Sequence, residues 1–258
     1  MITEQQFYQI KDLYKSGYKA TNIAKLLNLK FWDVQTRIRN IKSNITKQHF
    51  QPLNENFFET LDTEEKAYWL GFIYADGSIY SGYTLSIRLS EKDKLHLQKI
   101  SNIFGKEVKE KIIFLNEKEY KQVRLEIYNK KIYNDLKKLG IENQKTYSDS
   151  TKIIESIPRN LISHFIRGVF DGDGNIHKDI NNNGHFSICG NENILKKIQI
   201  ALIETIELSK TKIYQLGDAW CWNLLYGGNI NIKKIYEYLY KESNIYLERK
   251  KLKFEEII

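Results

Sequence analysis

The stretch HFIRGVFDGDGNI, residues 164–176, places two aspartates in alternation with two glycines at the end of an apolar segment. A second stretch of the same plan, AYWLGFIYADGSI, occupies residues 67–79. Aligning both stretches on their final Asp-Gly pair superimposes Asp76 on Asp173, which are 97 residues apart. The chain is therefore built on an internal repeat.

The repeat argues against a calcium loop at this position. An EF-hand loop beginning at Asp171 requires glycine at its sixth position and glutamate at its twelfth. Ile176 and Asn182 occupy those positions, so we reject this reading. A single acidic turn with structural glycines would explain one copy of the motif, but two copies with matching spacing favour a functional pair.

Small residues recur four positions apart in both copies of the motif. Residues four apart lie on the same face of a helix, and a stripe of small residues lets two helix backbones approach closely. We therefore expect the two motif helices to pack on each other through Gly71, Ala75, Gly168 and Gly172.

Gly77 and Gly174 directly follow the two aspartates, and we expect both to cap their helices in a left-handed conformation. Asp76 and Asp173 then stand side by side at helix C-termini. This is an unfavourable place for two carboxylates, because the helix end is already partly negative and like charges repel. A hard divalent cation such as Mg²⁺, with Mn²⁺ as the alternative, would relieve the repulsion.

Further matches follow the motifs in the same order. SIRLSEKDKLHLQKI from Ser86 resembles SICGNENILKKI from Ser187, and KKIYNDL from Lys130 resembles KKIYEYL from Lys233. The two halves, residues 63–150 and 151–258, thus share one plan of helix, two strands, helix, two strands and helix. The fold class is α+β.

Strands in the first half alternate apolar and polar residues, in YTLSIRLS (83–90) and QVRLEIY (122–128). This period of two gives each strand one polar face. An ordinary half-exposed sheet alternates in the same way, but polar side chains on such a ribbon also suit the reading of base edges in a major groove. The candidate DNA contacts are Thr84, Ser86, Arg88, Gln122 and Arg124.

Residues 1–42 form a separate basic segment, with eight Lys/Arg against three Asp/Glu. Apolar residues at helical spacing predict three short helices, an arrangement typical of a helix-turn-helix domain. The segment resembles the helix-turn-helix of resolvase-like and sigma-like regulators, although Lys19 and Lys30 stand where a serine cap is common. The third helix would present Trp32, Thr36 and Arg39 to DNA. Residues 43–62 are expected to form a linker.

The paired motifs resemble those of LAGLIDADG homing endonucleases of the single-chain type, over residues 65–258. The resemblance implies a pseudo-dimeric αββαββα fold and Mg²⁺-dependent double-strand cleavage that leaves 3′ overhangs. It assigns metal binding to Asp76 and Asp173. Lys145 and Lys250, late in each half, resemble the active-site lysines of the family. Lys251 is an equally plausible candidate for the lysine of the second half.

Bulk properties agree with a nucleic-acid partner. The chain has 258 residues, 41% of them hydrophobic, and a formal net charge of +8, which suits a polyanion. Its two cysteines, Cys189 and Cys221, fit a reducing compartment and indicate neither a disulfide framework nor a zinc site. We find no membrane span or targeting signal, and expect a cytoplasmic (bacterial or phage) or organellar protein.

The leading hypothesis is a monomeric endonuclease that cuts a long asymmetric site in double-stranded DNA. The sequence neither begins with Cys or Ser nor ends in His-Asn, so we expect an intron-encoded or free-standing mobile element rather than an intein. Two alternatives on the same fold stay open. One is a DNA-binding transcriptional regulator without cleavage, and the other is a maturase that binds its intron RNA.

Overall fold

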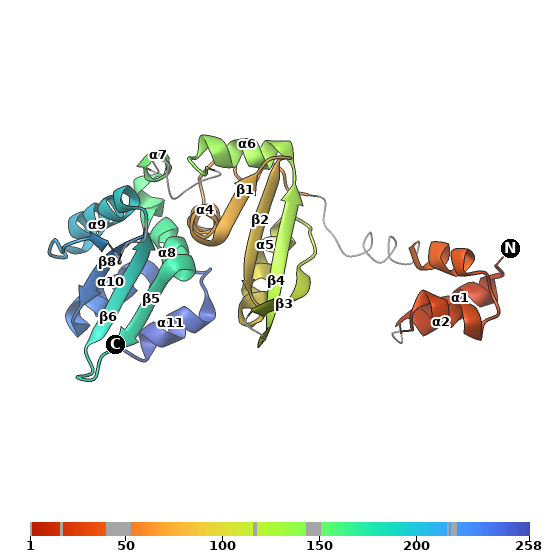
Figure 1. Ribbon diagram of the computed structural model, residues 1–258. Coiled ribbons are helices and arrows are strands. Elements are labelled where there is room, and N and C mark those ends of the chain that lie inside the picture. Colours follow the sequence, from red (N-terminus) through yellow and green to blue (C-terminus); the bar gives the residue numbers. More distant parts are fainter. Residues whose placement is uncertain are drawn as a thin grey trace. The chain divides into compact units, whose positions relative to one another are not determined.

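The computed structural model describes residues 2–15, 18–39, 53–115, 118–142, 151–215, 217 and 221–258. The chain divides into two compact units, Met1–Pro52 and Leu53–Ile258. Each unit has a hydrophobic core of its own, and Figure 1 follows the chain through both.

The first unit contains α1 (Glu4–Lys15), α2 (Ala20–Leu26) and a helix over residues 31–39. Its core consists of Ile10, Ile23, Ala24, Val34 and Ile38. These helices match the three that apolar spacing predicts. Leu26 of α2 lies outside this core and is 61% exposed.

The expected linker over residues 43–62 is wrong in its second part. Phe57 and Phe58 are buried and pack edge-on against each other, and Phe57 also packs on Phe104. Residues 53–62 therefore belong to the second unit, with Phe57 and Phe58 in its core. Burying two large aromatic side chains stabilises the fold, and this favours packing over a free linker. Residues 43–52 lie outside the described residues.

The first half of the second unit begins with the motif helix α4. Thr63 caps it, since its side-chain oxygen accepts a hydrogen bond from the Lys66 backbone N–H. The elements of this half are α4 (Glu64–Asp76), β1 (Gly77–Tyr80), β2 (Thr84–Ser90), η1 (Glu91–Asp93), α5 (Lys94–Ile103), β3 (Lys109–Leu115), β4 (Lys118–Tyr128) and α6 (Lys130–Lys138).

The second half repeats this order after the short helix α7 (Thr151–Glu155) and the turn η2 (Arg159–Leu161). Its elements are α8 (Ile162–Asp173), β5 (Gly174–Lys178), β6 (Gly184–Gly190), α9 (Glu192–Ile206), β7 (Tyr214–Gln215), β8 (Trp222–Gly227) and α10 (Asn229–Tyr240). A final helix, α11 (Glu248–Glu255), follows, and no helix described in the first half occupies the same place after α6.

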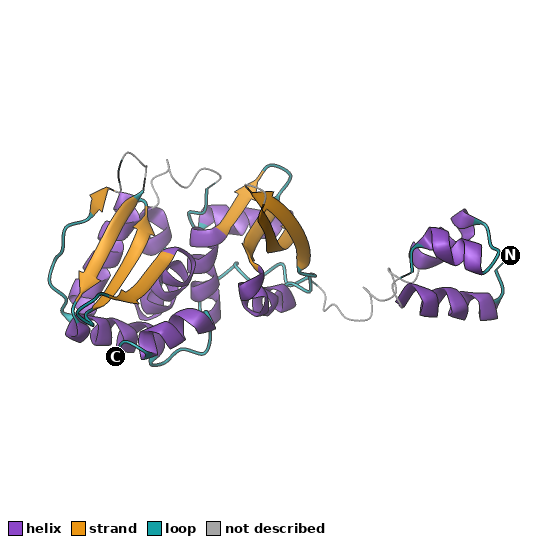
Figure 2. Cartoon of the chain, turned by 60° about the horizontal axis from the view of Figure 1, so that its bottom comes forward, coloured by secondary structure: helices purple, strands orange, loops and turns teal. Residues whose placement is uncertain are grey.

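Each half contains one antiparallel four-stranded sheet, ordered β1-β2-β4-β3 in the first and β5-β6-β8-β7 in the second. The motif helices α4 and α8 lie side by side between the two sheets (Figures 1 and 2). The αββαββα plan, repeated twice, confirms the predicted α+β fold.

The apolar faces of both sheets are covered by helices. Ile79, Leu85, Ile87, Val123 and Leu125 on the first sheet are all buried in one core that extends into the second half. The opposite face of each sheet carries polar side chains. Within the described residues, no helix is both long and apolar enough to cross a membrane.

Candidate functional site

The motif helices α4 and α8 approach each other at backbone distance. A Cβ added to Gly71 would lie 2.1 Å from the Phe165 carbonyl oxygen, and one added to Gly168 would lie 2.1 Å from the Tyr68 carbonyl oxygen. A Cβ on Gly172 would lie 2.3 Å from that of Ala75. The predicted stripe of small residues therefore forms the interface between the halves.

Gly77 and Gly174 end the two motif helices, but not in the expected left-handed conformation. Their φ angles are −83° and −88°, with extended ψ values. The reason is that each glycine is also the first residue of a strand, so the chain leaves the helix directly into β1 or β5. Glycine is required at both positions because any larger residue would clash with a neighbouring residue of its own motif helix. A Cβ would meet the Ile73 carbonyl oxygen at 2.7 Å in one case and the Phe170 ring at 2.2 Å in the other.

Asp76 and Asp173 are the last residues of α4 and α8. Asp76 is half-buried and Asp173 is exposed. The Asp76 carboxylate lies close to Gly172, since a Cβ built there would be 3.3 Å from Asp76 Oδ2. The helix interface thus brings the ends that carry the two acids together, at the junction between the sheets.

Lys250 lies under the end of α8 and is 5% exposed. Its ammonium donates to three carbonyl oxygens, those of Phe170 at 2.6 Å, Gly172 at 3.2 Å and Gly174 at 2.6 Å. Three acceptors match the three N–H bonds of a charged lysine. Burial lowers the pKa of Lys250 to about 8, although the charges of Asp171, Asp76 and Asp173 act in the opposite direction.

These contacts place Lys250 rather than Lys251 beneath the second acid. Lys251 points to the Tyr246 ring, with its Nζ 4.1 Å from the ring centre. A cation below the last carbonyls of α8 offsets the negative end of the helix, which carries Asp173. The other candidate lysine, Lys145, lies outside the described residues.

Asp171 is a buried structural acid that the motif comparison did not assign to metal binding. Its carboxylate accepts hydrogen bonds from the hydroxyls of Tyr68 at 2.7 Å and Tyr240 at 2.8 Å, and from the Leu247 backbone N–H at 2.7 Å. Burial raises the pKa of Asp171, while these hydrogen bonds favour the ionised form. The residue fixes the chain before α11, and with it Lys250.

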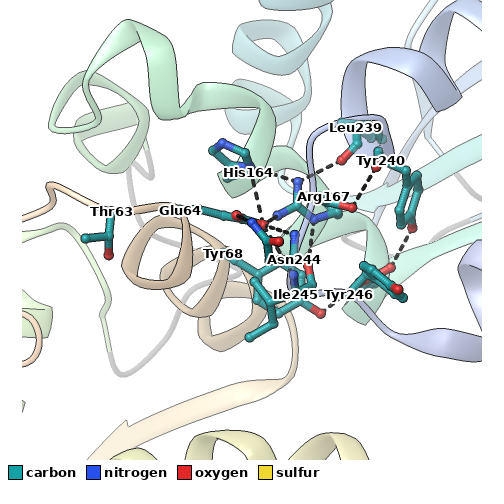
Figure 3. A network of polar contacts seen from close by, with 12 residues as sticks. Thr63, Glu64, Tyr68, His164, Arg167, Leu239, Tyr240, Asn244, Ile245 and Tyr246 are labelled. Atoms are coloured by element: carbon teal, nitrogen blue, oxygen red, sulfur yellow. Dashed lines mark hydrogen bonds and ion pairs between the residues drawn. The ribbon is translucent and has the colours of Figure 1, made fainter.

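A second buried network joins the two halves (Figure 3). Arg167 is fully buried on α8, and its guanidinium donates to Glu64 Oε1 at 2.7 Å, to the Ile245 carbonyl at 2.8 Å and to the Leu239 carbonyl at 2.7 Å. Glu64, on α4, also accepts from the backbone and side chain of Asn244. The segment after α10 is thereby tied to both motif helices.

Sequence reasoning missed this network. An arginine within the apolar run FIRGVF (165–170) signals a buried partner, but its partner Glu64 lies 103 residues away. Only the helix pairing of the fold identifies it.

On the first sheet, strand pairing places the five predicted DNA-contact residues on one face. Arg88 is exposed, and Gln122 and Arg124 are half-buried. Thr84 and Ser86 are 2% and 0% exposed, so the expectation that they reach base edges is wrong. Larger neighbours on the same face explain their burial. They are Tyr80, Arg124 and Glu126, which contact one another and leave little room above the small side chains.

The polar face of the second sheet was not assigned from the sequence, because β8 is too apolar to show alternation. Strand pairing now defines this face. It carries Asn175 and His177 from β5, His185 and Ser187 from β6, and Asn223 from β8. The rings of His177 and His185 stack at 5.2 Å.

In the first unit, the helix over residues 31–39 presents Trp32, Thr36 and Arg39 on one exposed side. Trp32 is 73% exposed. The Thr36 hydroxyl donates to the Trp32 carbonyl oxygen at 2.8 Å, so it is bonded within its own helix. Val34 and Ile38 on the other side are buried.

The donor set limits which cofactor the site suits. Among the described residues, no group of three or more His, Cys, Asp or Glu side chains is arranged to hold a metal ion. Two carboxylates at adjacent helix ends fit an ion that takes most of its ligands from water or from a substrate phosphate, as Mg²⁺ does. They do not fit zinc, which prefers a closed set of nitrogen and sulfur ligands.

No protein-family model and no curated protein matches the sequence. Solved structures do match the fold. The homing endonuclease I-WcaI bound to its DNA recognition sequence is similar with a TM-score of 0.57 and 14% identity, over 74% of this chain and 87% of that chain. This similarity shows a shared fold.

Two further structures are similar at lower scores. Full-length DUF199/WhiA from Thermatoga maritima gives a TM-score of 0.48 and 19% identity, over 80% of this chain and 66% of that chain. I-SmaMI bound to uncleaved DNA in the presence of calcium ions gives a TM-score of 0.47 and 15% identity, over 71% of this chain and 86% of that chain.

Proposed function

From the LAGLIDADG homing endonuclease fold of this chain, we propose that the protein is a site-specific endonuclease that cuts both strands of DNA with a divalent metal ion. The observation that carries the proposal is the position of Asp76 and Asp173 at the adjacent ends of two helices packed through glycine. A fold that needed only to bind DNA would gain nothing from two acids at negative helix ends.

Asp76 and Asp173 are the residues that would hold Mg²⁺, or Mn²⁺ in its place, together with phosphate oxygens of the DNA. The ion supplies Lewis-acid activation of water and neutralises charge on the phosphate. Lys250 keeps the end of α8 fixed and offsets its negative charge, so that Asp173 stays in position. Lys145 is proposed as the lysine that assists catalysis in the first half.

The polar faces of the two sheets are proposed to contact the DNA on either side of the cut. Arg88, Gln122 and Arg124 serve this role on the first sheet, and the histidine pair His177 and His185 on the second. The side chains differ between the halves, which supports a long asymmetric target. Because one chain carries both acids, we propose that it acts as a monomer.

The first unit is proposed to add a further DNA contact through Trp32 and Arg39, which are exposed on one helix. It would lengthen the bound site and raise affinity. Removing residues 1–42 should then weaken binding to the full target while cleavage of bound DNA continues. Equal affinity of the full and shortened proteins would contradict this role.

The experiment begins with selection of bound sequences from random duplex DNA in Ca²⁺, which allows binding but is a poor geometric substitute for Mg²⁺. Mg²⁺ is then added to the selected sequence. We expect a staggered double-strand cut with 3′ overhangs. A site that is bound tightly and never cut would instead favour a transcriptional regulator. Preference for intron RNA over duplex DNA in the same assay would favour a maturase.

A further inference from the structure

Cys189 and Cys221 are brought together on the polar face of the second sheet. Cys189, in β6, pairs with Asn223 of β8, and its thiol contacts the Asn223 side-chain oxygen at 3.6 Å. Cys221 precedes Asn223 by two residues, and in extended chain this spacing keeps side chains on one face. Its side chain interacts with the Cys189 thiol. Both residues are half-buried.

The cysteine pair lies beside the second acid. Gly174 of β5 pairs with Ile188 of β6 in the antiparallel sheet. One residue beyond this pair, Asp173 and Cys189 therefore lie next to each other. The Asp173 charge also acts on the Cys189 thiol. The first half has different residues here. Gly77 pairs with Ile87, which puts Arg88 next to Asp76.

The same comparison extends to the other cysteine. Arg88 pairs with Arg124 of β4 as Cys189 pairs with Asn223 of β8. Gln122 precedes Arg124 by two residues, as Cys221 precedes Asn223. Two thiols in the second half therefore replace Arg88 and Gln122 of the first half, at the edge of the candidate site.

We propose that Cys189 and Cys221 are a dithiol site that a small-molecule disulfide, such as oxidised glutathione, converts reversibly into an intramolecular disulfide. The Cys221 thiolate attacks the glutathione disulfide and releases one glutathione thiolate, which takes up a proton. The Cys189 thiolate then attacks the mixed disulfide at Cys221 and releases the second glutathione. One glutathione disulfide is reduced to two thiols for each protein disulfide that forms.

Two observations favour a disulfide over the other uses of a thiol pair. A soft metal ion would gain from a third ligand, and no three-residue cluster of His, Cys, Asp or Glu suited to a metal occurs in the part of the chain described. The thiols are also neighbours on one face of the sheet, because Cys189 pairs with Asn223 and Cys221 lies two residues before it.

The disulfide would change the site at Asp173 and leave the site at Asp76 untouched. It would cross-link β6 to the chain entering β8 and remove both thiol hydrogens beside Asp173. The consequence for cleavage rests on the proposed function. The oxidised protein should cut the DNA strand at Asp76 as the reduced protein does, and cut the other strand more slowly. Nicked DNA then accumulates.

The disulfide itself is tested without DNA. The native full-length chain is incubated with oxidised glutathione, and its intact mass is measured. We expect the loss of two hydrogens, reversed by dithiothreitol. Cys189→Ser and Cys221→Ser should each gain one glutathione instead. Glutathione adducts on the wild type without a cross-link, or an unchanged mass, would overturn the proposal.

The consequence for cleavage is tested on a plasmid that carries the selected site. Reduced wild type should give linear DNA, and oxidised wild type should give a higher ratio of nicked to linear DNA. The ratio for a variant with both cysteines changed to serine should not respond to oxidised glutathione. Equal ratios for reduced and oxidised wild type would contradict control by the disulfide. No cutting by the reduced protein would instead contradict the proposed function, whatever the mass measurement shows.

Discussion

The backbone of Phe165 passes so close to Gly71 that a methyl group on Gly71 would lie 2.1 Å from the Phe165 carbonyl oxygen. Contact at this distance is possible only between helices that lack side chains at the crossing. It is this approach that brings the last residues of α4 and α8 together. The glycines of the interface therefore set the geometry of the acids as well as the packing of the halves.

Gly71→Ala and Gly168→Ala should each destabilise the protein strongly. The neighbouring atoms are backbone, which cannot move aside as a flexible side chain can, so we expect a loss of about 3 kcal/mol or more in the free energy of unfolding. Urea denaturation measures it. Gly190→Ala is the matched control, because a Cβ at that position would have nothing within 4 Å. An equal loss in all three variants would contradict the close approach.

Breaking the ion pair between Glu64 and Arg167 should also be costly. Glu64→Gln leaves a fully buried guanidinium without its counter-charge, and we expect a loss of about 3–5 kcal/mol in stability. Glu65→Gln, one residue along the same helix, is the control. Burial raises the pKa of Glu65, so its neutralisation should be harmless or slightly stabilising. A stability of Glu64→Gln equal to that of Glu65→Gln would show that the pair is unimportant.

The repeat was sufficient to predict the αββαββα plan, because the small-residue stripe and the strand alternation are local patterns. The same local reasoning did not find Arg167 and Glu64, whose pairing depends on which helices meet. It also placed Thr84 and Ser86 correctly on the polar face and still misjudged them. Exposure depends on the size of the neighbours, and Tyr80 decides it here together with Arg124 and Glu126.

The candidate site was predicted in part. The positions of Asp76 and Asp173 at helix ends followed from the motif. Lys250 was expected near the site, but its contacts with backbone carbonyls were not, because no sequence pattern indicates a lysine that supports a helix end. The meeting of Cys189 and Cys221 likewise requires the pairing of β6 with β8.

Lys250→Met should remove the support of the α8 end. We expect a loss of about 1–3 kcal/mol in stability, because the carbonyls of Phe170, Gly172 and Gly174 lose a buried donor. In a plasmid assay the variant should accumulate nicked DNA, since the Lys250 ammonium binds the carbonyls on both sides of Asp173 in the chain. Lys253→Met, on the exposed side of the same helix, is the control. Equal slowing of both cuts would contradict a role confined to one site.

The buried His96 should make the protein sensitive to acid. Its ring lies between Trp69 and Phe72 and contacts the Tyr68 hydroxyl at 2.9 Å. Burial lowers the pKa of His96 to about 3, with Lys99 and Arg249 acting in the same direction and Asp93 in the opposite one. Because the folded pKa is below the unfolded value, this contribution to stability is complete above about pH 6.5 and is lost progressively as the pH falls toward 3.

The prediction is a fall in unfolding free energy of up to about 1.4 kcal/mol per pH unit from this group. Thermal or urea unfolding measured between about pH 7 and pH 4 tests it. His96→Gln should have a shallower dependence than the wild type. Identical slopes for the wild type and His96→Gln would contradict the assignment.

Cleavage of the selected DNA site in Mg²⁺, compared between the wild type, Asp76→Asn and Asp173→Asn, tests the assignment of the two acids. Asparagine keeps the shape of each side chain and removes the charge that a metal ion requires. We expect the wild type to make a double-strand cut, and both variants to bind in Ca²⁺ while failing to make that cut. If the variants cut both strands as fast as the wild type, or if the wild type binds without cutting, the two aspartates are not the acids of a nuclease.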